Sequence, residues 1–366
     1  MTRNIMSPAK YIQGKGEIRR LHRYCAELEG KKAYIVADAF VLANYEKEIS
    51  EGFQGGDVSY VLHSFTGECS LKEVQRIVEA VKESEADVII GIGGGKTLDA
   101  AKAVGFYSRL PLIVAPTVAS TDAPCSALSV LYTEDGRLDK YLYLRSNPDR
   151  VVVDTELVAK APVRLLVAGM GDALSTYYEA RACRRSAESR GENKSTIGAY
   201  ALAQACRDTL LADGLQAKQD AENGILSEAV ENIIEANIYL SGIGFESGGL
   251  AAAHAIHNGL TLLEETRPVM HGEKVAFTTI VQLVLENAPI QELEEIIKFN
   301  RSIGLPVTLE EMHLSAEQQD RLRIAAEASC APGTPMDNMP FSVTSENIVK
   351  AMLKVDQLGR QLPLKF

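Results

Sequence analysis

The stretch Asp87–Lys102 reads DVIIGIGGGKTLDAAK, an apolar β-rich run that ends in three consecutive glycines and continues into a helical pattern. Glycine adopts positive φ readily and lets the backbone approach another group closely, so such a strand can turn directly into a helix. The first turn of that helix offers free N–H groups and a favourable dipole to a phosphate. The pattern therefore predicts a strand, a phosphate-binding loop and a helix. The candidate contacts are Gly94, Gly95, Lys96, Thr97 and Asp99.

Two familiar phosphate-binding motifs fail on this loop. A P-loop would need glycine where Ile90 stands, and the third glycine of a G-x-G-x-x-G fingerprint would fall on Lys96. A tight turn without a ligand therefore stays an alternative. The position of the loop at a strand end, with Lys96 and Thr97 following, favours phosphate binding.

Strand-like runs alternate with helical patterns through the first half of the chain, which favours a parallel sheet covered on both faces. The expected strands are Ala33–Ala37, Val58–Leu62, Asp87–Gly91, Leu112–Ala115 and Arg150–Asp154. Residues 127–133 and 141–145 flank an Asp135-Gly136 turn signal and predict a β-hairpin.

From about Pro162 the pattern becomes helical, and glycine and proline mark most of the expected helix ends. The expected helices are 172–183, 195–212, 227–241, 254–263, 273–286, 290–303, 316–328 and 345–357. With 366 residues, the chain has the length of roughly two domains. We therefore predict an α/β nucleotide-binding domain over residues 1–160 and an all-helical domain over residues 161–366.

Composition restricts the partners and the compartment. The formal net charge of −11 argues against nucleic acid and anionic membranes, because no basic surplus is present to neutralise phosphates. No apolar run reaches the roughly 18 residues of a membrane span, and the first residues carry no secretory signal pattern. Six scattered cysteines, none in C-x-x-C, are typical of free thiols in a reducing compartment. We expect a cytoplasmic protein.

Two further segments are expected at the carboxyl edge of the sheet, where open α/β sheets bind their ligands. The loop after the strand at 112–115 reads PTVASTDAPCS and carries several hydroxyls and the carboxylate of Asp122. Asp38 ends the first strand, which suits a carboxylate that binds an adenosine ribose. A helix cap at Asp38 is an equally good interpretation.

Three of the six histidines, His254, His257 and His271, fall in one stretch of the helical half. Imidazole is the commonest metal ligand, and no cysteine pair at zinc-finger spacing accompanies these residues, which favours a catalytic metal over a structural one. His254 and His257 are three apart and share a helix face. Asp172, in GMGDALSTYYEA between a glycine turn and a helix, is a candidate third ligand, with a simple N-cap as the alternative.

Five ordered motifs together resemble the glycerol dehydrogenases of the iron/zinc-dependent (group III) polyol dehydrogenase superfamily. They are GIGGGKTLDAAK, PTVASTDAPCSALSVLYT, GMGDALSTYYEARA, ESGGLAAAHAIHNGLT and HGEKVAF, and the resemblance covers essentially the whole chain. It implies a Rossmann-like parallel α/β domain followed by an all-α metal domain, the architecture of dehydroquinate synthase and iron-containing alcohol dehydrogenases, with the site in the cleft between them. It also implies NAD-dependent oxidation of glycerol to dihydroxyacetone, or of related vicinal diols such as 1,2-propanediol, by a homo-oligomer such as an octamer.

The resemblance also implies roles for single residues. Asp172, His254 and His271 match metal ligands, Asp122 matches a contact to the substrate hydroxyl, and His257 matches a position near the metal that is not usually a direct ligand. For His257 we hypothesise a relay of the substrate proton to solvent, with structural support of a ligand as the alternative. The positions that match the lining of an NAD site are Asp38, Gly95, Lys96, Thr117, Ser120, Ser126, Leu128 and Tyr132. Iron-dependent relatives carry histidine four residues after the metal aspartate, where this chain has Thr176, so we expect Zn²⁺, although Fe²⁺ also suits such a ligand set.

Other functions in the same superfamily are less well supported. A dehydroquinate-synthase-like lyase acts on a phosphorylated substrate, which would need several cationic side chains near the metal. Between residues 245 and 280 the only cationic side chains are Arg267 and Lys274. An enzyme of the same superfamily that acts on another polyol remains an alternative. A metal-dependent hydrolase that uses a zinc hydroxide is an alternative from a different class, and it would not need the glycine loop.

Overall fold

The computed structural model describes residues 2–65, 67–191 and 195–361. Its contacts divide the chain into two compact units. The α/β unit comprises residues 6–119 and 123–162, and the helical unit comprises residues 1–5, 120–122 and 163–366. The short segment Ser120–Asp122 therefore belongs to the helical unit, although its neighbours in sequence belong to the other.

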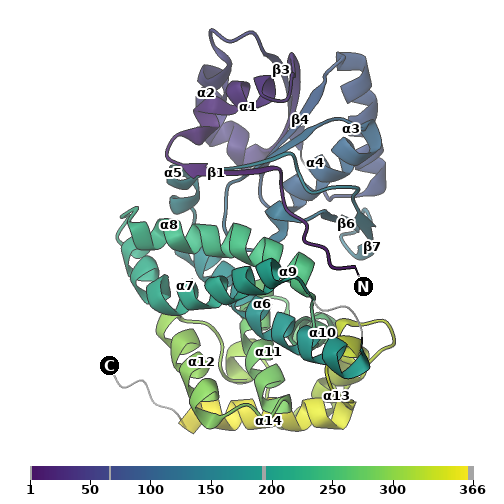
Figure 1. The fold of residues 1–366 in the computed structure, drawn as a ribbon, viewed down its shortest axis with the longest axis vertical. Coiled ribbons are helices and arrows are strands. Elements are labelled where there is room, and N and C mark those ends of the chain that lie inside the picture. Colours follow the sequence, from purple (N-terminus) through teal and green to yellow (C-terminus); the bar gives the residue numbers. More distant parts are fainter. Residues whose placement is uncertain (1, 66, 192–194, 362–366) are drawn as a thin grey trace. The chain divides into compact units, whose positions relative to one another are not determined.

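A six-stranded parallel sheet forms the centre of the α/β unit (Figure 1). In order across the sheet the strands are β1 (Lys10–Gly14), β8 (Arg150–Asp154), β5 (Leu112–Pro116), β4 (Val88–Gly93), β2 (Lys32–Asp38) and β3 (Ser59–Phe65). The helices of this unit are α1 (Leu21–Ala26), α2 (Ala39–Phe53), α3 (Leu71–Ser84), α4 (Gly95–Ser108) and α5 (Thr155–Ala159). Figure 1 shows α2 on one face of the sheet and α3 and α4 on the other.

The sheet confirms the strands expected from the sequence. Every residue of β4, β5 and β8 is buried, as strands covered on both faces must be, and their runs of Ile, Val and Leu are continuous for that reason. β1 was not predicted, and it pairs in parallel with β8 at the edge of the sheet. The predicted hairpin is confirmed as β6 (Leu128–Tyr132) and β7 (Leu138–Tyr143), which turn through Gly136 at φ +79°.

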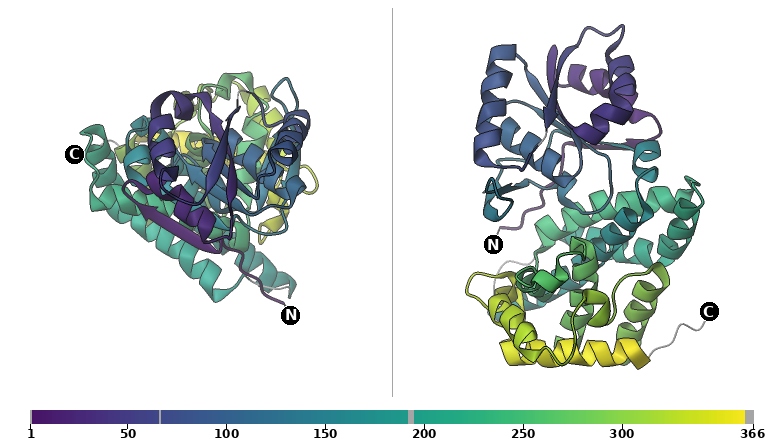
Figure 2. Two further views of the ribbon diagram at one scale, coloured as in Figure 1. Left: turned by 90° about the horizontal axis from the view of Figure 1, so that it is seen from above. Right: turned by 180° about the vertical axis from the view of Figure 1, so that it is seen from behind.

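The helical unit is built around one long helix, α6 (Val163–Arg190). The other helices are α7 (Ile197–Glu222), α8 (Glu228–Glu235), α9 (Ser241–Gly248), α10 (Ala252–Leu260), α11 (His271–Leu285), α12 (Ile290–Ile303), α13 (Gln319–Ser329) and α14 (Ser345–Gln361). Figure 2 shows α14, in yellow, running along one end of this unit. Among the described residues, no helix has the length and apolar character needed to cross a membrane.

The predicted start of α6 is wrong. The helix begins at Val163 and passes through Gly169 and Gly171 without a break, so Asp172 lies inside the helix and is not its N-cap. Glycine in a helix is unfavourable by only about 1 kcal/mol relative to alanine, and tertiary packing outweighs that preference here.

Candidate active site

The glycine loop lies between β4 and α4, with Gly94 at the N-cap position. Gly93 has φ +156°, and a Cβ atom on it would lie 2.5 Å from Asp38 Oδ2 and 2.8 Å from Thr97 Cβ. Apart from their own chain neighbours and the backbone of α4, no described residue lies within 4 Å of a Cβ position on Gly94 or Gly95. The loop is therefore tightly packed where the strand ends and open where the helix begins, as a backbone that binds a phosphate must be.

Asp38 caps the helix that follows β2 and also reaches the glycine loop. Its Oδ1 accepts a hydrogen bond from Val41 N at 2.9 Å and caps α2. Its Oδ2 lies 3.4 Å from both Gly94 N and Thr97 Oγ1, so the same carboxylate reaches the glycine loop. The cap is therefore observed, and a ribose contact by Asp38 stays a prediction.

Lys96 and Tyr132 lie side by side in the α/β unit. The Lys96 Nζ atom is 5.6 Å from the centre of the Tyr132 ring and 2.6 Å from Glu68 Oε1. Lys96 is therefore already paired with a carboxylate, which sequence reasoning did not anticipate. To contact a phosphate, Lys96 would have to break its ion pair with Glu68.

The other residues predicted to line a cofactor site differ in exposure. Leu128 is half-buried on β6, and Ser120 is half-buried in the short segment that belongs to the helical unit. Thr117, Ser126 and Asp99 are at most 7% exposed. Burial raises the pKa of Asp99 to about 6, although the charge of Lys102 acts in the opposite direction.

Lys102, which the sequence analysis missed, organises the loop that follows β5. Its side chain is fully buried, and its ammonium group donates to Ala123 O at 2.5 Å, Leu128 O at 2.9 Å and Ser126 Oγ at 3.3 Å. A buried ammonium group is tolerated only when its donors are satisfied. The one signal in the sequence is a lysine three residues after Asp99 on an otherwise small and apolar helix face.

We expect Lys102→Met to lower the free energy of unfolding by about 3 kcal/mol, because the three hydrogen bonds donated by the buried ammonium group would be lost. Urea denaturation of the purified variant measures this loss. Lys350→Met is the control, since Lys350 is 70% exposed and its replacement should change stability by less than about 0.5 kcal/mol. Equal urea midpoints for the Lys102 variant and the wild type would show that these hydrogen bonds contribute nothing.

The helical unit brings Asp172, His254 and His271 together from α6, α10 and α11. One ligand atom from each lies within 4.8 Å of the others. Asp172 Oδ1 is 3.1 Å from His271 Nε2 and 3.5 Å from His254 Nε2. A carboxylate and two imidazoles are ligands that zinc accepts, and three protein ligands leave a coordination position open for a substrate. The donor set therefore fits a catalytic divalent metal.

Charge reinforces this arrangement. Asp172 is 1% exposed, and burial alone would raise the pKa of its carboxyl group. The imidazoles of His271 and His254 outweigh burial and hold that pKa well below its usual range. Asp172 is thus an ionised carboxylate, which is the form that binds a metal.

The group depends on a close crossing of α6 and α11. Gly171 precedes Asp172, and Gly272 follows His271. A Cβ atom on Gly171 would lie 2.4 Å from Gly272 O, and one on Gly272 would lie 1.8 Å from Ala168 O. The two backbones are in contact, and the ligands beside the glycines meet for that reason.

Asp122 lies next to this group within the helical unit. Its backbone N–H points at Asp172 Oδ2 at 3.4 Å, and its own Oδ2 accepts a 2.8 Å hydrogen bond from Ser241 Oγ. Burial, followed by the charge of Asp172, raises the pKa of Asp122 well above its usual value. The structure therefore brings the predicted substrate contact to the predicted metal ligands.

Ser241 is a further residue that the sequence analysis missed. It follows a turn of π-helix at Ala236–Leu240, a feature that often marks functional sites. Its hydroxyl is fully buried and lies 2.8 Å from Thr176 Oγ1. Thr176, at the position where a histidine was considered, therefore takes part in a hydrogen-bond chain to Asp122 instead.

His257 is close to the group without belonging to it. Its ring lies 4.2 Å from the His271 ring, centre to centre, and its Nδ1 is 3.0 Å from Asn258 Oδ1. The side chain is buried, and burial followed by the charges of His271 and His254 lowers its pKa well below the usual value. His257 is therefore a neutral imidazole next to the candidate metal ligands.

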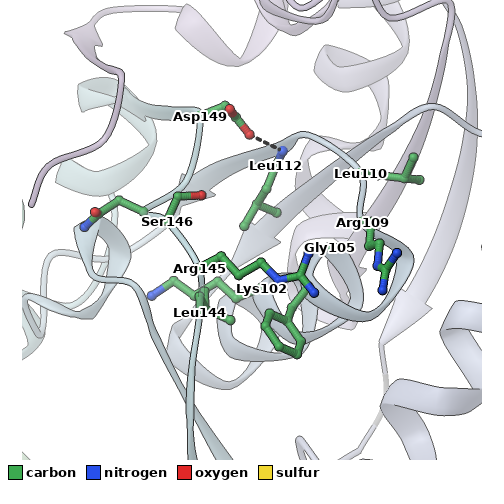
Figure 3. A pocket seen from close by; sticks show the side chains of 11 residues that line it. Lys102, Gly105, Arg109, Leu110, Leu112, Leu144, Arg145, Ser146 and Asp149 are labelled. Carbon is green, nitrogen blue, oxygen red and sulfur yellow. Dashed lines mark hydrogen bonds between the residues drawn. The ribbon is translucent and has the colours of Figure 1, made fainter.

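A cavity of about 230 Å³ in the α/β unit lies elsewhere (Figure 3). It is lined by the C-terminal part of α4 and by residues 144–149, and the Asp149 carboxylate within it accepts a 2.8 Å hydrogen bond from Leu112 N. Leu112 begins β5, and Asp149 directly precedes β8. The cavity is thus at the amino edge of the sheet, opposite the edge where parallel sheets bind ligands.

Known proteins share up to half of the residues of this chain, and solved structures share its fold. Residues 8–155 match the family model of the iron-containing alcohol dehydrogenases. The chain is 50% identical over 362 residues to a glycerol dehydrogenase from Citrobacter freundii, covering 99% of both chains, and 43% identical to a glycolaldehyde reductase from Halobacterium salinarum, again covering 99% of both. The crystal structure of glycerol dehydrogenase from Schizosaccharomyces pombe superposes with a TM-score of 0.92 at 38% identity, covering 98% of this chain and 92% of that one. The chain is therefore an oxidoreductase of the iron-containing alcohol dehydrogenase family and belongs, within it, to the glycerol dehydrogenases.

Proposed function

We propose that this enzyme oxidises glycerol to dihydroxyacetone with NAD⁺ as the hydride acceptor. The observation that carries the proposal is the group of Asp172, His254 and His271, whose ligand atoms lie within 4.8 Å of one another. Relatives named glycerol dehydrogenase that share up to half of its residues over nearly its whole length support the choice of substrate. The open glycine loop at Gly94 and Gly95 supports a dinucleotide.

Asp172, His254 and His271 would hold the metal. Zinc lowers the pKa of a bound water from about 15.7 to about 7, and a similar effect on an alcohol would supply on the order of 10 kcal/mol toward removal of its proton. We favour Zn²⁺ because Thr176, and not an additional imidazole, follows Asp172 by four residues. Fe²⁺ is the alternative that the same ligands accept.

The protein groups would bind and orient the substrate and move its proton. Asp122, held by Ser241, would accept a hydrogen bond from a substrate hydroxyl. His257 would take up the proton: its Nδ1 faces the side-chain amide oxygen Oδ1 of Asn258 and donates to it, which leaves the lone pair of Nε2 to accept. NAD would be bound by Asp38 and the glycine loop. NAD carries the redox chemistry, and the protein positions it.

We further propose a cytoplasmic homo-oligomer. All six cysteines are free thiols, which fits a reducing compartment.

A phosphorylated substrate is disfavoured by the few cationic side chains near the candidate metal ligands. Between residues 245 and 280, Lys274 is buried in α11, which leaves Arg267 as the exposed cationic side chain.

The substrate is tested by following NADH formation over glycerol, 1,2-propanediol and ethanol, each with NAD⁺ and with NADP⁺. We expect turnover with the vicinal diols and NAD⁺, and little with ethanol. A second candidate, reduction of glycolaldehyde, is favoured by the Halobacterium relative. It is tested in the opposite direction, by following NADH consumption with glycolaldehyde and with dihydroxyacetone. A higher kcat/KM for glycolaldehyde than for dihydroxyacetone, without turnover of glycerol, would replace the first proposal by the second.

A further inference from the structure

A buried glutamate lies behind one of the candidate metal ligands. Glu179 follows Asp172 by seven residues on α6, which is two helical turns, so both carboxylates lie on the same helix face. The Glu179 side chain is 0% exposed. Its Oε2 is 2.6 Å from His254 Nδ1, on the side of the ring away from the Nε2 atom that faces Asp172.

The second oxygen of Glu179 fixes the backbone of the same ligand. Oε1 accepts hydrogen bonds from Ala251 N at 2.8 Å and from His254 N at 2.9 Å. These are among the first N–H groups of α10, which have no partner inside the helix. Ala251, the N-cap residue, has no side chain that could bind them. One carboxylate from α6 therefore caps α10 and contacts the ring of its histidine.

This geometry determines which nitrogen of His254 is free to bind a metal. An ionised carboxylate can only accept hydrogen bonds, so the ring must carry its proton on Nδ1. In the neutral ring the lone pair is then on Nε2, the atom directed at Asp172. The other tautomer would place a proton on Nε2, where the metal would bind, and would leave Nδ1 facing the carboxylate without a proton.

The chain also passes close to α6 just before α10. Gly249 has φ +94°, and a Cβ atom on it would lie 2.9 Å from Cys183 Sγ. Glycine is therefore required there for the backbone to bring Ala251 and His254 onto the Glu179 carboxylate. The contact between Glu179 and His254 is therefore fixed by the packing of α6 and of the segment that leads into α10.

We propose that Glu179 is a positioning residue that holds His254 in its metal-binding tautomer and orientation; this inference rests on the proposed metal site. Carboxylates that accept the second N–H of a metal-binding histidine typically increase metal affinity or activity 10- to 100-fold. Among the described residues, Glu179 forms hydrogen bonds with Ala251 and His254, and none with Asp172 or His271.

The test uses Glu179→Gln, which preserves size. If the amide oxygen of the new side chain accepts the hydrogen bonds from the two backbone N–H groups, its NH₂ group faces Nδ1 of His254. Because that NH₂ group can only donate a hydrogen bond, the neutral ring must then carry its proton on Nε2. We expect Zn²⁺ affinity, measured by competition with a chelator, to fall about 10- to 100-fold. Activity should return substantially at saturating Zn²⁺, because all three ligands remain.

Glu286→Gln is the matched control. Glu286 is also a buried glutamate of the helical unit, 2% exposed, but it pairs with Arg181 and Arg185 and not with a histidine. It should lose stability and keep its Zn²⁺ affinity. Unchanged affinity in Glu179→Gln, or an equal loss of affinity in both variants, would overturn the proposal.

A second measurement does not depend on the folding of the variant or on the metal. Nitrogen NMR of metal-free wild-type enzyme, recorded at alkaline pH where the ring is neutral, should show His254 protonated on Nδ1. A neutral ring protonated on Nε2 would overturn the role of Glu179 even if zinc binds. If His254 is protonated on Nδ1 but Asp172→Asn binds Zn²⁺ as tightly as the wild type, the proposed metal site fails and the orientation of His254 stands.

Discussion

Asp172→Asn should lose its tightly bound metal, and kcat/KM for glycerol should fall by more than about 100-fold, beyond the loss expected for a residue that merely supports a ligand. Asparagine has nearly the same volume as aspartate but carries no charge. In the buried group it would leave the two imidazoles of His254 and His271 facing a neutral amide. Metal content per chain and steady-state kinetics measure the two effects.

The control for this prediction is Asp320→Asn, at a side chain that is 93% exposed on α13. It should keep the metal and the activity of the wild type. An Asp172→Asn enzyme that retains its metal and more than a tenth of its activity would show that the ligands are wrongly assigned.

Gly272→Ala should lower the free energy of unfolding by about 3 kcal/mol, the upper end of the usual cost of overpacking a core. The new Cβ would lie 1.8 Å from Ala168 O, so α6 and α11 must move apart. That movement would separate Asp172 from His271, which are 3.1 Å apart across this crossing. We therefore expect a lower Tm together with weaker Zn²⁺ binding.

Gly198→Ala is the control for the glycine prediction. Gly198 lies in the first turn of α7, and its Cβ would meet Ile5 at an ordinary 3.5 Å. Alanine should be neutral there or stabilising by up to about 1 kcal/mol. If Gly272→Ala matched the wild type in both Tm and Zn²⁺ affinity, the close helix crossing would not be what assembles the site.

The α/β unit could be predicted because its signals are local. The strands around Ile35, Ile90 and Val114 are continuous apolar runs, and the glycines after Ile92 mark the turn into α4. The start of α6 could not be predicted in the same way, because Gly169 and Gly171 read as a turn. The actual reason for Gly171 is the backbone contact with Gly272 of α11, about one hundred residues later in the chain.

The same difference between local signals and long-range contacts decides which residues of the candidate site could be predicted. The sequence pattern indicated the three histidines and Asp172 as candidates, resemblance to a family selected Asp172, His254 and His271 from them, and the structure brings these three together. Lys102 and Glu179 went unnoticed because their partners are distant backbone atoms and a histidine ring on another helix. Such contacts have no periodicity or spacing that a single sequence displays.

The central claim is that this enzyme oxidises glycerol through a metal held by Asp172, His254 and His271. It is tested most directly by removing metal from the wild type with a chelator and titrating Zn²⁺ back while NADH formation from glycerol is followed. We predict no turnover without metal and, on addition of Zn²⁺, a rise to a plateau at one ion per chain; Asp172→Asn should show no such rise. Full turnover by wild-type enzyme that mass spectrometry shows to be metal-free would contradict the claim.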